Sequence, residues 1–306
     1  MKRYAFATII SLSISLGYSQ SIRSQLQMDI NKLEEGANNG SAHDQYWLAM
    51  CYMGGSGVER NTETALKWFL LADQNGKDAK EYIADCYLIE EEYEEAIKWY
   101  LLAENKGRDI NFKLGRCYYE SKKYEEAEKR FTSALQDRWF AKASKLWLGM
   151  TYIALSKYEE ALDWLLKASR DGLTSALNIG HCYYELNNYS LAIEWYQKAE
   201  SEGNSIASHN LPIVQAKAGE QAYNNKDFES AFKFLEAAST NKRNPQGDAM
   251  RLLGACYRYD DKIKDNEKAQ YWLDMAVKYN DPIAKELKET LLSGKEILNI
   301  INKNGL

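Results

Sequence analysis

Five cysteines are the side chains of this sequence with the widest chemistry, since a thiol can attack an electrophile, bind a metal or form a disulfide. Each is followed directly by a tyrosine; the positions are Cys51, Cys86, Cys117, Cys182 and Cys256. This regularity indicates one recurring position in a repeated unit. Equivalent positions on neighbouring helices are separated by about 8–10 Å, whereas a disulfide needs Cα atoms within about 7 Å. We therefore expect buried packing residues and no intramolecular bridge.

The other residues with catalytic or ligand-binding chemistry are scattered. His43, His181 and His209 lie far apart in the sequence, and none is paired with another ligand at the spacing of a metal site. The stretch Gly54 to Gly57 lacks the Lys-Ser or Lys-Thr of a phosphate-binding loop. Acidic pairs stand where helices are expected to begin, and carboxylates there stabilise the positive end of the helix dipole; they include Glu94-Glu95, Glu125-Glu126 and Glu159-Glu160. We predict no catalysis, no cofactor and no metal.

The elements that carry these residues form an internal repeat. An alanine recurs about every 30 to 40 residues, a period typical of stacked helix pairs; the aligned positions are Ala65, Ala96, Ala127, Ala161, Ala192, Ala231 and Ala269. In the fourth copy, small and apolar residues mark one helical face around Gly149 and a second around Leu165. The short turn Ser156-Lys157 between them fits only an antiparallel hairpin. Each copy is therefore predicted as helix A, a turn and helix B.

Two residue types predict how these helices pack. Glycine costs about 1 kcal/mol relative to alanine inside a helix, so the glycines of helix A indicate a close approach of a neighbouring helix; they are Gly115, Gly149, Gly180, Gly219 and Gly254. Tryptophan recurs three residues after the aligned alanine and is predicted to fill the space between repeats; the positions are Trp68, Trp99, Trp164, Trp195 and Trp272.

The middle copies resemble the tetratricopeptide repeat, as in Leu114-Gly115-Arg116-Cys117-Tyr118 followed by Tyr124-Glu125-Glu126-Ala127. Several copies end in a pair similar to that of the related Sel-like repeat: Asn75-Gly76, Lys106-Gly107, Asp171-Gly172 and Glu202-Gly203. The resemblance covers residues 41–280 and departs from the tetratricopeptide pattern where a proline usually closes helix B. It implies an all-α fold, a right-handed α-solenoid of antiparallel helix pairs.

The ends of the chain differ from the repeats. Residues 1–19 have Lys2 and Arg3 before an apolar stretch and resemble a secretory signal peptide cleaved after Ser19. That stretch is shorter than the roughly 20 residues that span a bilayer, so no integral membrane segment is expected after cleavage. Residues 20–40 are predicted as an N-terminal capping helix, and residues 281–306 as a C-terminal capping helix and tail that begin with Asp281 as N-cap.

Seven helix-pair repeats are predicted between these ends, at about 41–76, 77–107, 108–140, 141–172, 173–204, 212–244 and 245–280. The sixth copy has the weakest match, because Gln221 and Ala222 stand where other copies have cysteine and tyrosine. The segment before it is longer than in other copies and contains Pro212, which predicts an altered stacking angle.

In the tetratricopeptide families helix A lines the concave side of the array, so helix A residues not used for packing are the candidate contacts for a partner. They recur one turn apart on one face and are Phe112, Arg116, Tyr119, Glu120, Leu146, Met150, Leu177, His181, Tyr184 and Glu185. The alternative is that these side chains pack against the next helix A. Asp78, Glu81 and Asp85 predict an acidic region on the same face, which would suit a basic or aromatic-rich protein segment, extended or helical.

The net charge of −5 without a basic run argues against a nucleic-acid partner. The main interpretation is an exported protein-interaction scaffold or adaptor without catalysis, located in the periplasm, at the cell surface or outside the cell. One alternative is a cell-wall-fragment or antibiotic-like small-molecule binding protein or hydrolase, as associated with a Cys-rich Sel-like branch whose second cysteine per repeat is absent here. Another is a cytosolic adaptor that retains residues 1–19. The partner's identity and the oligomeric state are not predicted.

Overall fold

The computed structural model describes residues 20–104, 110–241, 244–260 and 262–289, and these form sixteen α-helices and no strand. This confirms the predicted all-α class. The predicted signal peptide lies outside the described residues. The helices are α2 (Gln20–Asn38), α3 (Ala42–Gly54), α4 (Thr62–Gln74), α5 (Lys80–Ile89), α6 (Tyr93–Glu104), α7 (Asn111–Glu120), α8 (Tyr124–Ala134), α9 (Ala141–Ala154), α10 (Tyr158–Arg170), α11 (Ala176–Glu185), α12 (Tyr189–Ser201), α13 (Ser205–Asn224), α14 (Phe228–Ser239), α15 (Gly247–Tyr259), α16 (Asn266–Lys278) and α17 (Pro282–Glu289).

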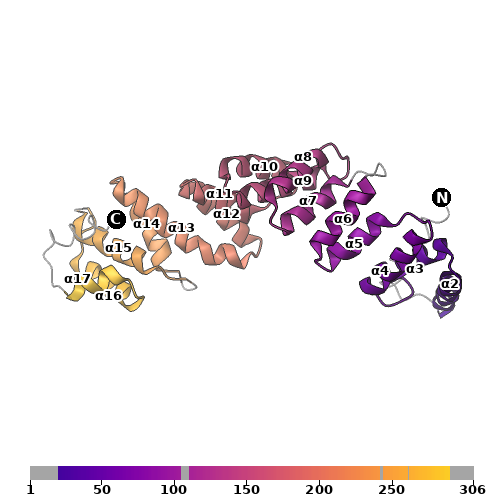
Figure 1. The fold of residues 1–306 in the computed structure, drawn as a ribbon. Coiled ribbons are helices and arrows are strands. Elements are labelled where there is room, and N and C mark those ends of the chain that lie inside the picture. Colours follow the sequence, from indigo (N-terminus) through magenta and orange to yellow (C-terminus); the bar gives the residue numbers. More distant parts are fainter. Residues whose placement is uncertain (1–19, 105–109, 242–243, 261, 290–306) are drawn as a thin grey trace. The chain divides into compact units, whose positions relative to one another are not determined.

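Helices that follow one another along the chain pack together as antiparallel pairs (Figure 1). The chain divides into two compact units, residues 1–147 and 148–306, with the division inside α9. In the first unit the pairs are α3 with α4, α5 with α6 and α7 with α8; in the second they are α11 with α12, α13 with α14 and α15 with α16. The fold is thus an α-solenoid of helix pairs.

Most turns within a pair share one backbone design. Ser156, in the turn that leads from α9 to α10, has a left-handed φ of 57°, and Lys157 N donates a hydrogen bond of 2.8 Å to Tyr152 O. This is the geometry of a Schellman motif, in which one left-handed residue lets the last carbonyls of a helix find donors. The residues with positive φ at the equivalent place are Glu91, Lys122, Asn187 and Lys226.

Glycine serves the same purpose in the turn that follows α10. Gly172 has a φ of 89°, and Leu173 N donates to Ala168 O at 3.0 Å. A Cβ at Gly172 would meet nothing within 4 Å, so its backbone conformation, and not lack of space, favours glycine here. The glycine that ends these pairs in the sequence therefore ends helix B.

The core follows the small residues of the repeat. The seven aligned alanines are buried, and the residue four positions later is fully or almost fully buried in six copies: Phe69, Tyr100, Phe131, Leu165, Tyr196 and Leu235. These side chains occupy the space left by the glycines of helix A. A Cβ on Gly149 would lie 2.5 Å from Leu165 Cγ, and one on Gly115 would lie 2.7 Å from Phe131 Cδ1. The close approach predicted from the glycines is confirmed.

The tryptophans lie at the edge of the core. All five are half-buried, and Trp68, Trp99, Trp195 and Trp272 pack against buried clusters. Trp99 packs against the clusters of two successive repeats, as predicted for a residue that fills the space between them. Two of the tryptophans also carry a cation over the ring: Lys167 Nζ lies 4.3 Å from the centre of Trp164, and Lys198 Nζ lies 4.8 Å from that of Trp195. These two rings cover the edge of the core, and the lysine ammonium group over each ring lies on the solvent side.

The cysteines are packing residues, as predicted. All five are free thiols; Cys51 is half-buried and the other four are buried. Burial raises the pKa of Cys86, Cys117, Cys182 and Cys256 to about 12. Such thiols stay protonated at neutral pH and are poor nucleophiles.

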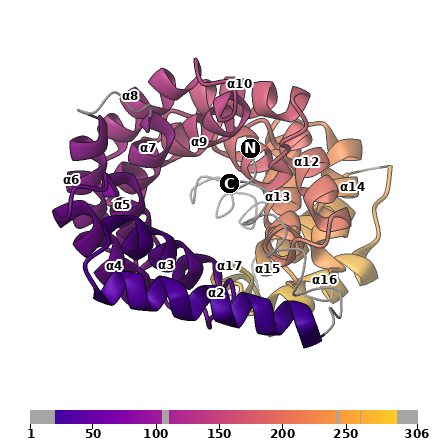
Figure 2. The same cartoon turned by 90° about the vertical axis from the view of Figure 1, so that its right-hand side faces the viewer.

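Helices also cover both ends of the paired array. α2 packs on α3 with Ile30 and Ala37 buried (Figure 2). At the other end, Asp281 caps α17 by accepting a hydrogen bond from Ala284 N at 2.6 Å, as predicted for this residue. The same carboxylate accepts a hydrogen bond from Arg251 Nε at 3.1 Å, and both side chains are almost completely buried.

The sixth helix pair starts earlier than its predicted boundary at residue 212. Asn204 caps α13 by accepting from Ala207 N at 3.0 Å, and the helix continues through Pro212 to Asn224. Proline lacks the N–H that would bond to Ser208 O. The neighbouring carbonyl of His209 accepts a hydrogen bond of 2.9 Å from Asn244 Nδ2. The proline thus lies inside the helix rather than before it.

Candidate partner-binding face

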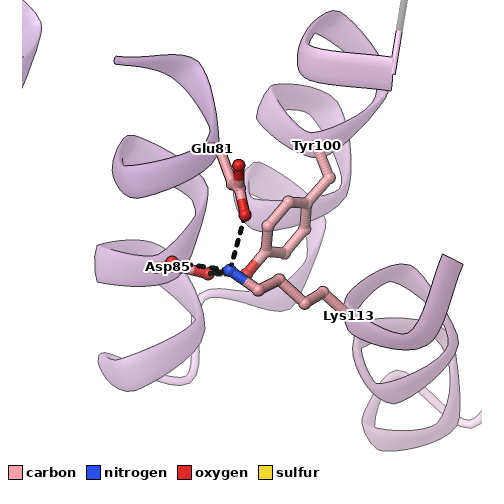
Figure 3. A network of polar contacts seen from close by, with 4 residues as sticks. All are labelled: Glu81, Asp85, Tyr100 and Lys113. Carbon is pink, nitrogen blue, oxygen red and sulfur yellow. Dashed lines mark hydrogen bonds and ion pairs between the residues drawn. The ribbon is translucent and has the colours of Figure 1, made fainter. Parts of the chain in front are cut away.

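A network of four polar side chains connects α5, α6 and α7 (Figure 3). Lys113 Nζ donates to Asp85 Oδ1 and Oδ2 at 2.8 Å and to Glu81 Oε1 at 2.9 Å. The Tyr100 hydroxyl, from the core of α6, donates to Asp85 Oδ1. One ammonium group therefore holds two carboxylates of the preceding helix A.

The electrostatics of this network are those of a mutually satisfied cluster. Burial alone would lower the pKa of the Lys113 ammonium, but the ion pairs with Asp85 and Glu81 outweigh it and hold the pKa above its ordinary value. Burial and the adjacent Asp85 carboxylate raise the pKa of the Tyr100 hydroxyl. The side chains of Lys113, Glu81 and Asp85 are 25%, 24% and 16% exposed. The ammonium of Lys113 thus compensates one of the two negative charges within the chain.

This compensation changes the expected acidic region. Glu81 and Asp85 are paired with Lys113, and Lys80 Nζ lies 2.5 Å from Asp73 Oδ1 and 3.7 Å from Asp78 Oδ1. Two lysines thus pair with four carboxylates, so the acidic character of this region is reduced but kept. Lys113, which supplies half of this compensation, comes from the next repeat.

Arg116, one turn after Lys113, has a different environment. Its guanidinium carbon lies 5.6 Å from the centre of the Trp147 ring. Its Nε is buried and has no hydrogen-bond partner among the described residues. No ion pair to Arg116 is formed within the described part of the chain either. Arg116 is therefore a half-buried cation that rests on an aromatic ring and keeps its charge uncompensated.

Aromatic rings surround this cation on the α7 side. Tyr119 packs edge-on against Trp147 and against Tyr124, with centroid distances of 5.3 and 5.5 Å. Phe131 stacks on Trp147 at 5.6 Å. Phe112, one turn before Arg116, stacks on Phe140 at 4.7 Å with an angle of 6° between the rings. These contacts form a fixed aromatic floor around Arg116, which we call the Arg116 face: Phe112, Arg116, Tyr119 and Trp147.

Two repeat-family models match the chain. The Sel1 repeat model matches residues 42–76 and 247–278, and the tetratricopeptide repeat model matches residues 63–110, 112–172 and 148–205. The chain belongs to the tetratricopeptide and Sel1-like repeat superfamily. The Sel1 matches cover the pairs α3–α4 and α15–α16, whose connecting turns are longer than those of the other pairs. In both, the residue that caps the second helix, Asn61 or Asp265, donates its N–H back to a tyrosine carbonyl of the first.

Solved structures share the repeat fold. The C-terminal part of a tetratricopeptide repeat protein from Cytophaga hutchinsonii is similar over 80% of this chain and 97% of its own, with a TM-score of 0.55 and 15% identity. PilF of Pseudomonas aeruginosa is similar over 66% of this chain and 91% of its own, with a TM-score of 0.44 and 21% identity. YrrB, described as having an unusual peptide-binding site, is similar over 62% of this chain and 96% of its own, with a TM-score of 0.43 and 22% identity. None of the curated proteins matches this chain.

The repeats place the predicted partner-binding residues in two groups. In the first unit, Phe112, Arg116 and Tyr119 come together with Trp147 as described, whereas Glu120 is exposed at the end of α7. Leu146, on α9, is half-buried. The Arg116 face is thus partly an inter-helix contact and partly accessible.

In the second unit, the predicted residues also combine packing with exposure. Leu177 and Tyr184 pack against the core between α11, α12 and α13. His181 packs edge-on against Tyr158 at 5.8 Å, and its Nδ1 lies 3.9 Å from Glu185 Oε1. Met150 is half-buried in α9. His181 and Glu185 are the more accessible members, with about a third or more of each side chain exposed.

Sequence reasoning missed the residue that follows the first predicted contact in two of the A helices, α7 and α9. Lys113 follows Phe112 and reaches back to Asp85; Trp147 follows Leu146 and reaches back to Arg116. A usable signal was present, since each partner stands about one repeat earlier and has complementary chemistry. Carboxylates precede a lysine, and a guanidinium precedes an aromatic ring.

Other features of the described residues offer less defined chemistry. An open cavity of about 790 Å³ lies at the junction of α12 and α13. It is lined by Glu200, Gly203, Ser205, Ser208 and His209. Within the described residues, no group of three or more His, Cys, Asp or Glu side chains is arranged to hold a metal ion. None of the described helices has the length and apolar character to cross a membrane.

Proposed function

We propose that this chain is an exported interaction scaffold that holds a segment of a partner protein on the A helices and performs no chemistry itself. The superfamily supports the scaffold part of this proposal. The observation that carries the binding site is Arg116, a half-buried cation with an unsatisfied Nε on an aromatic floor. Arginine and aromatic side chains are the residues that most often dominate binding at protein interfaces.

The local charge favours a partner segment with a carboxylate. Lys113 pairs with both Glu81 and Asp85, so only part of the negative charge that suggested a basic segment remains on α5. Arg116 instead offers hydrogen-bond donors to an anion, and a planar guanidinium matches a carboxylate in geometry. Tyr119 and Phe112 offer apolar surface beside it. We therefore propose a segment that combines an acidic and an apolar or aromatic residue.

Affinity capture from the native cell envelope tests the site. The chain, starting at Gln20, is compared with Arg116→Met/Tyr119→Ala and with Arg170→Met, which removes an exposed arginine from the end of α10. Proteins recovered with wild type and Arg170→Met should be lost with the double variant, while circular dichroism shows that all three remain folded. Identical recovery by all three would refute the proposed face.

Export is supported by the basic start and apolar stretch of residues 2–19. N-terminal sequencing of the protein isolated from its native cells tests it. The expected mature N-terminus is Gln20 in the envelope or secreted fraction. Detection of Met1 as the N-terminus in the soluble cell fraction would contradict export and would favour the interpretation as a cytosolic adaptor.

A further inference from the structure

The turn between α8 and α9 presents an exposed tryptophan. Trp139 is 77% exposed, the highest value among the large hydrophobic side chains of the described residues, where the next is Ile206 at 57%. Burying an aromatic ring of this size contributes strongly to association. The repeated core does not need this ring, since the turn's other aromatic residue, Phe140, makes the packing contact.

The turn is held rigidly on both sides of Trp139. Asp137 Oδ1 accepts hydrogen bonds from Trp139 N at 2.6 Å and from Phe140 N at 3.1 Å. Asp137 O accepts from Ala141 N at 3.0 Å, which joins the turn to α9. The Phe140 ring is stacked on Phe112. A preformed turn loses little conformational entropy when a partner binds.

Arg138 adds an uncompensated positive charge at the same place. Its guanidinium carbon lies 5.0 Å from the centre of the Trp139 ring, and Arg138 is exposed. It forms no ion pair within the described part of the chain. The carboxylate of the turn, Asp137, accepts from the backbone N–H groups of Trp139 and Phe140. The exposed guanidinium of Arg138 therefore complements a carboxylate of a ligand.

The turn also adjoins the Arg116 face. Phe112 belongs to that face and stacks on Phe140, the residue next to Trp139. We propose that Trp139 and Arg138 form a second anchor for the same partner segment, in which an apolar side chain packs on the Trp139 ring and a carboxylate pairs with Arg138. This inference rests on the proposed function. It assigns the segment a second acidic-apolar pair beyond the one held at Arg116.

A protein segment suits this anchor better than a membrane surface. Stable attachment to a bilayer needs a continuous apolar helix face or two anchoring groups. The turn offers one exposed ring, and its other aromatic ring is stacked inside the protein. Tryptophan and arginine are among the residues that most often dominate binding at protein interfaces.

A random peptide library displayed on phage and selected on the chain from Gln20 onward tests the inference. Enriched peptides are synthesised with a fluorophore, and their Kd values are measured by anisotropy. Acidic peptides with an apolar residue should be enriched, and Trp139→Ala should raise their Kd about 30-fold or more. Arg138→Gln should raise the Kd less and should make it less dependent on salt concentration. Tyr271→Ala, which removes a ring that is 55% exposed elsewhere, is the matched control and should bind as wild type.

The remaining outcomes separate this inference from the proposed function. Peptides weakened by Arg116→Met but not by Trp139→Ala would overturn the second anchor and leave the function standing. Failure to enrich any peptide would overturn both. Sedimentation with vesicles of phosphatidylcholine and phosphatidylglycerol in equal parts is the membrane arm. Vesicle binding that depends on Trp139 would overturn the assignment of a protein partner.

Discussion

Lys113 illustrates how one side chain can pair with two carboxylates of a neighbouring repeat. It holds Glu81 and Asp85, and Asp85 in turn accepts from Tyr100. Removing one partner of a buried ion pair costs more than the pair contributes, because the remaining charges stay desolvated. Since Lys113 is 25% exposed, water can reach the group and reduce that cost.

We predict that Lys113→Met lowers the free energy of unfolding by about 1–3 kcal/mol at neutral pH, measured by urea denaturation. In the background Glu81→Gln/Asp85→Asn, the same replacement should cost less than about 1 kcal/mol, because neutral amides tolerate the loss of the cation. An equal cost in both backgrounds would show that Lys113 contributes through its alkyl chain and not its charge.

The thiol of Cys117 predicts an alkaline limit to stability. Burial raises its pKa from 9.0 to about 12 in the folded chain. The folded state therefore binds this proton more tightly than the unfolded state, so the contribution is fully present below pH 9 and is lost as the pH rises toward 12. We predict that Cys117→Ala flattens the decline of unfolding free energy over this range by up to about 1.4 kcal/mol per pH unit.

Urea denaturation at a series of pH values measures this difference between wild type and Cys117→Ala. Cys51→Ala is the comparison, because Cys51 is half-buried and burial raises its pKa only to about 11. The Cys51 thiol should stop contributing to the pH dependence of stability near pH 11, whereas the Cys117 thiol should contribute up to about pH 12. Parallel stability curves for wild type and Cys117→Ala would contradict the prediction.

At the scale of elements, the turns within the pairs store a small backbone strain. Ser156 has a left-handed φ of 57°, a conformation that costs a residue with a Cβ about 1–2 kcal/mol. Ser156→Gly should raise the free energy of unfolding by about 0.5–1 kcal/mol after the greater entropy of unfolded glycine is subtracted. Asn187→Gly is the matched variant and should gain less, because asparagine tolerates this conformation. Thermal unfolding measures both; a loss of stability in Ser156→Gly would contradict the proposed strain.

The elements were the part of this protein that sequence predicted best. The turn at Ser156-Lys157 lies where expected, since a short polar segment between periodic helices leaves few alternatives. The sixth copy was predicted to start at residue 212, whereas Asn204 caps α13 and the helix contains Pro212. Trp164 is half-buried, and the neighbouring Leu165 takes the fully buried position of the core.

The candidate site was less predictable for a physical reason. Helical periodicity identifies the residues on one face, but the rotation of one helix A against the next decides which of them touch. Lys113 and Trp147 come from the helix that follows, and their contacts with Asp85 and Arg116 depend on that rotation. Trp139 lies in a turn, outside any periodic pattern, and only its hydrogen-bonded surroundings distinguish it.

At the scale of the whole molecule, packing between helices runs mainly between neighbours along the chain. In such arrays stability is approximately a sum of repeat and nearest-neighbour terms, so damage should remain local. Leu235 is fully buried in α14 and fills the space beside Gly219. Leu235→Ala should cost about 2–5 kcal/mol in that pair.

Hydrogen exchange followed by mass spectrometry can locate that loss. Leu235→Ala should speed exchange most in α13, α14 and α15, which pack against one another, and leave α3 and α4 unchanged. Leu235→Met keeps the side-chain volume and should have a much smaller effect in the same helices. Faster exchange by the same factor in α3 and α14 would contradict this prediction. It would mean that all pairs unfold together as one cooperative unit, in which a cavity in α14 lowers the stability of every helix equally.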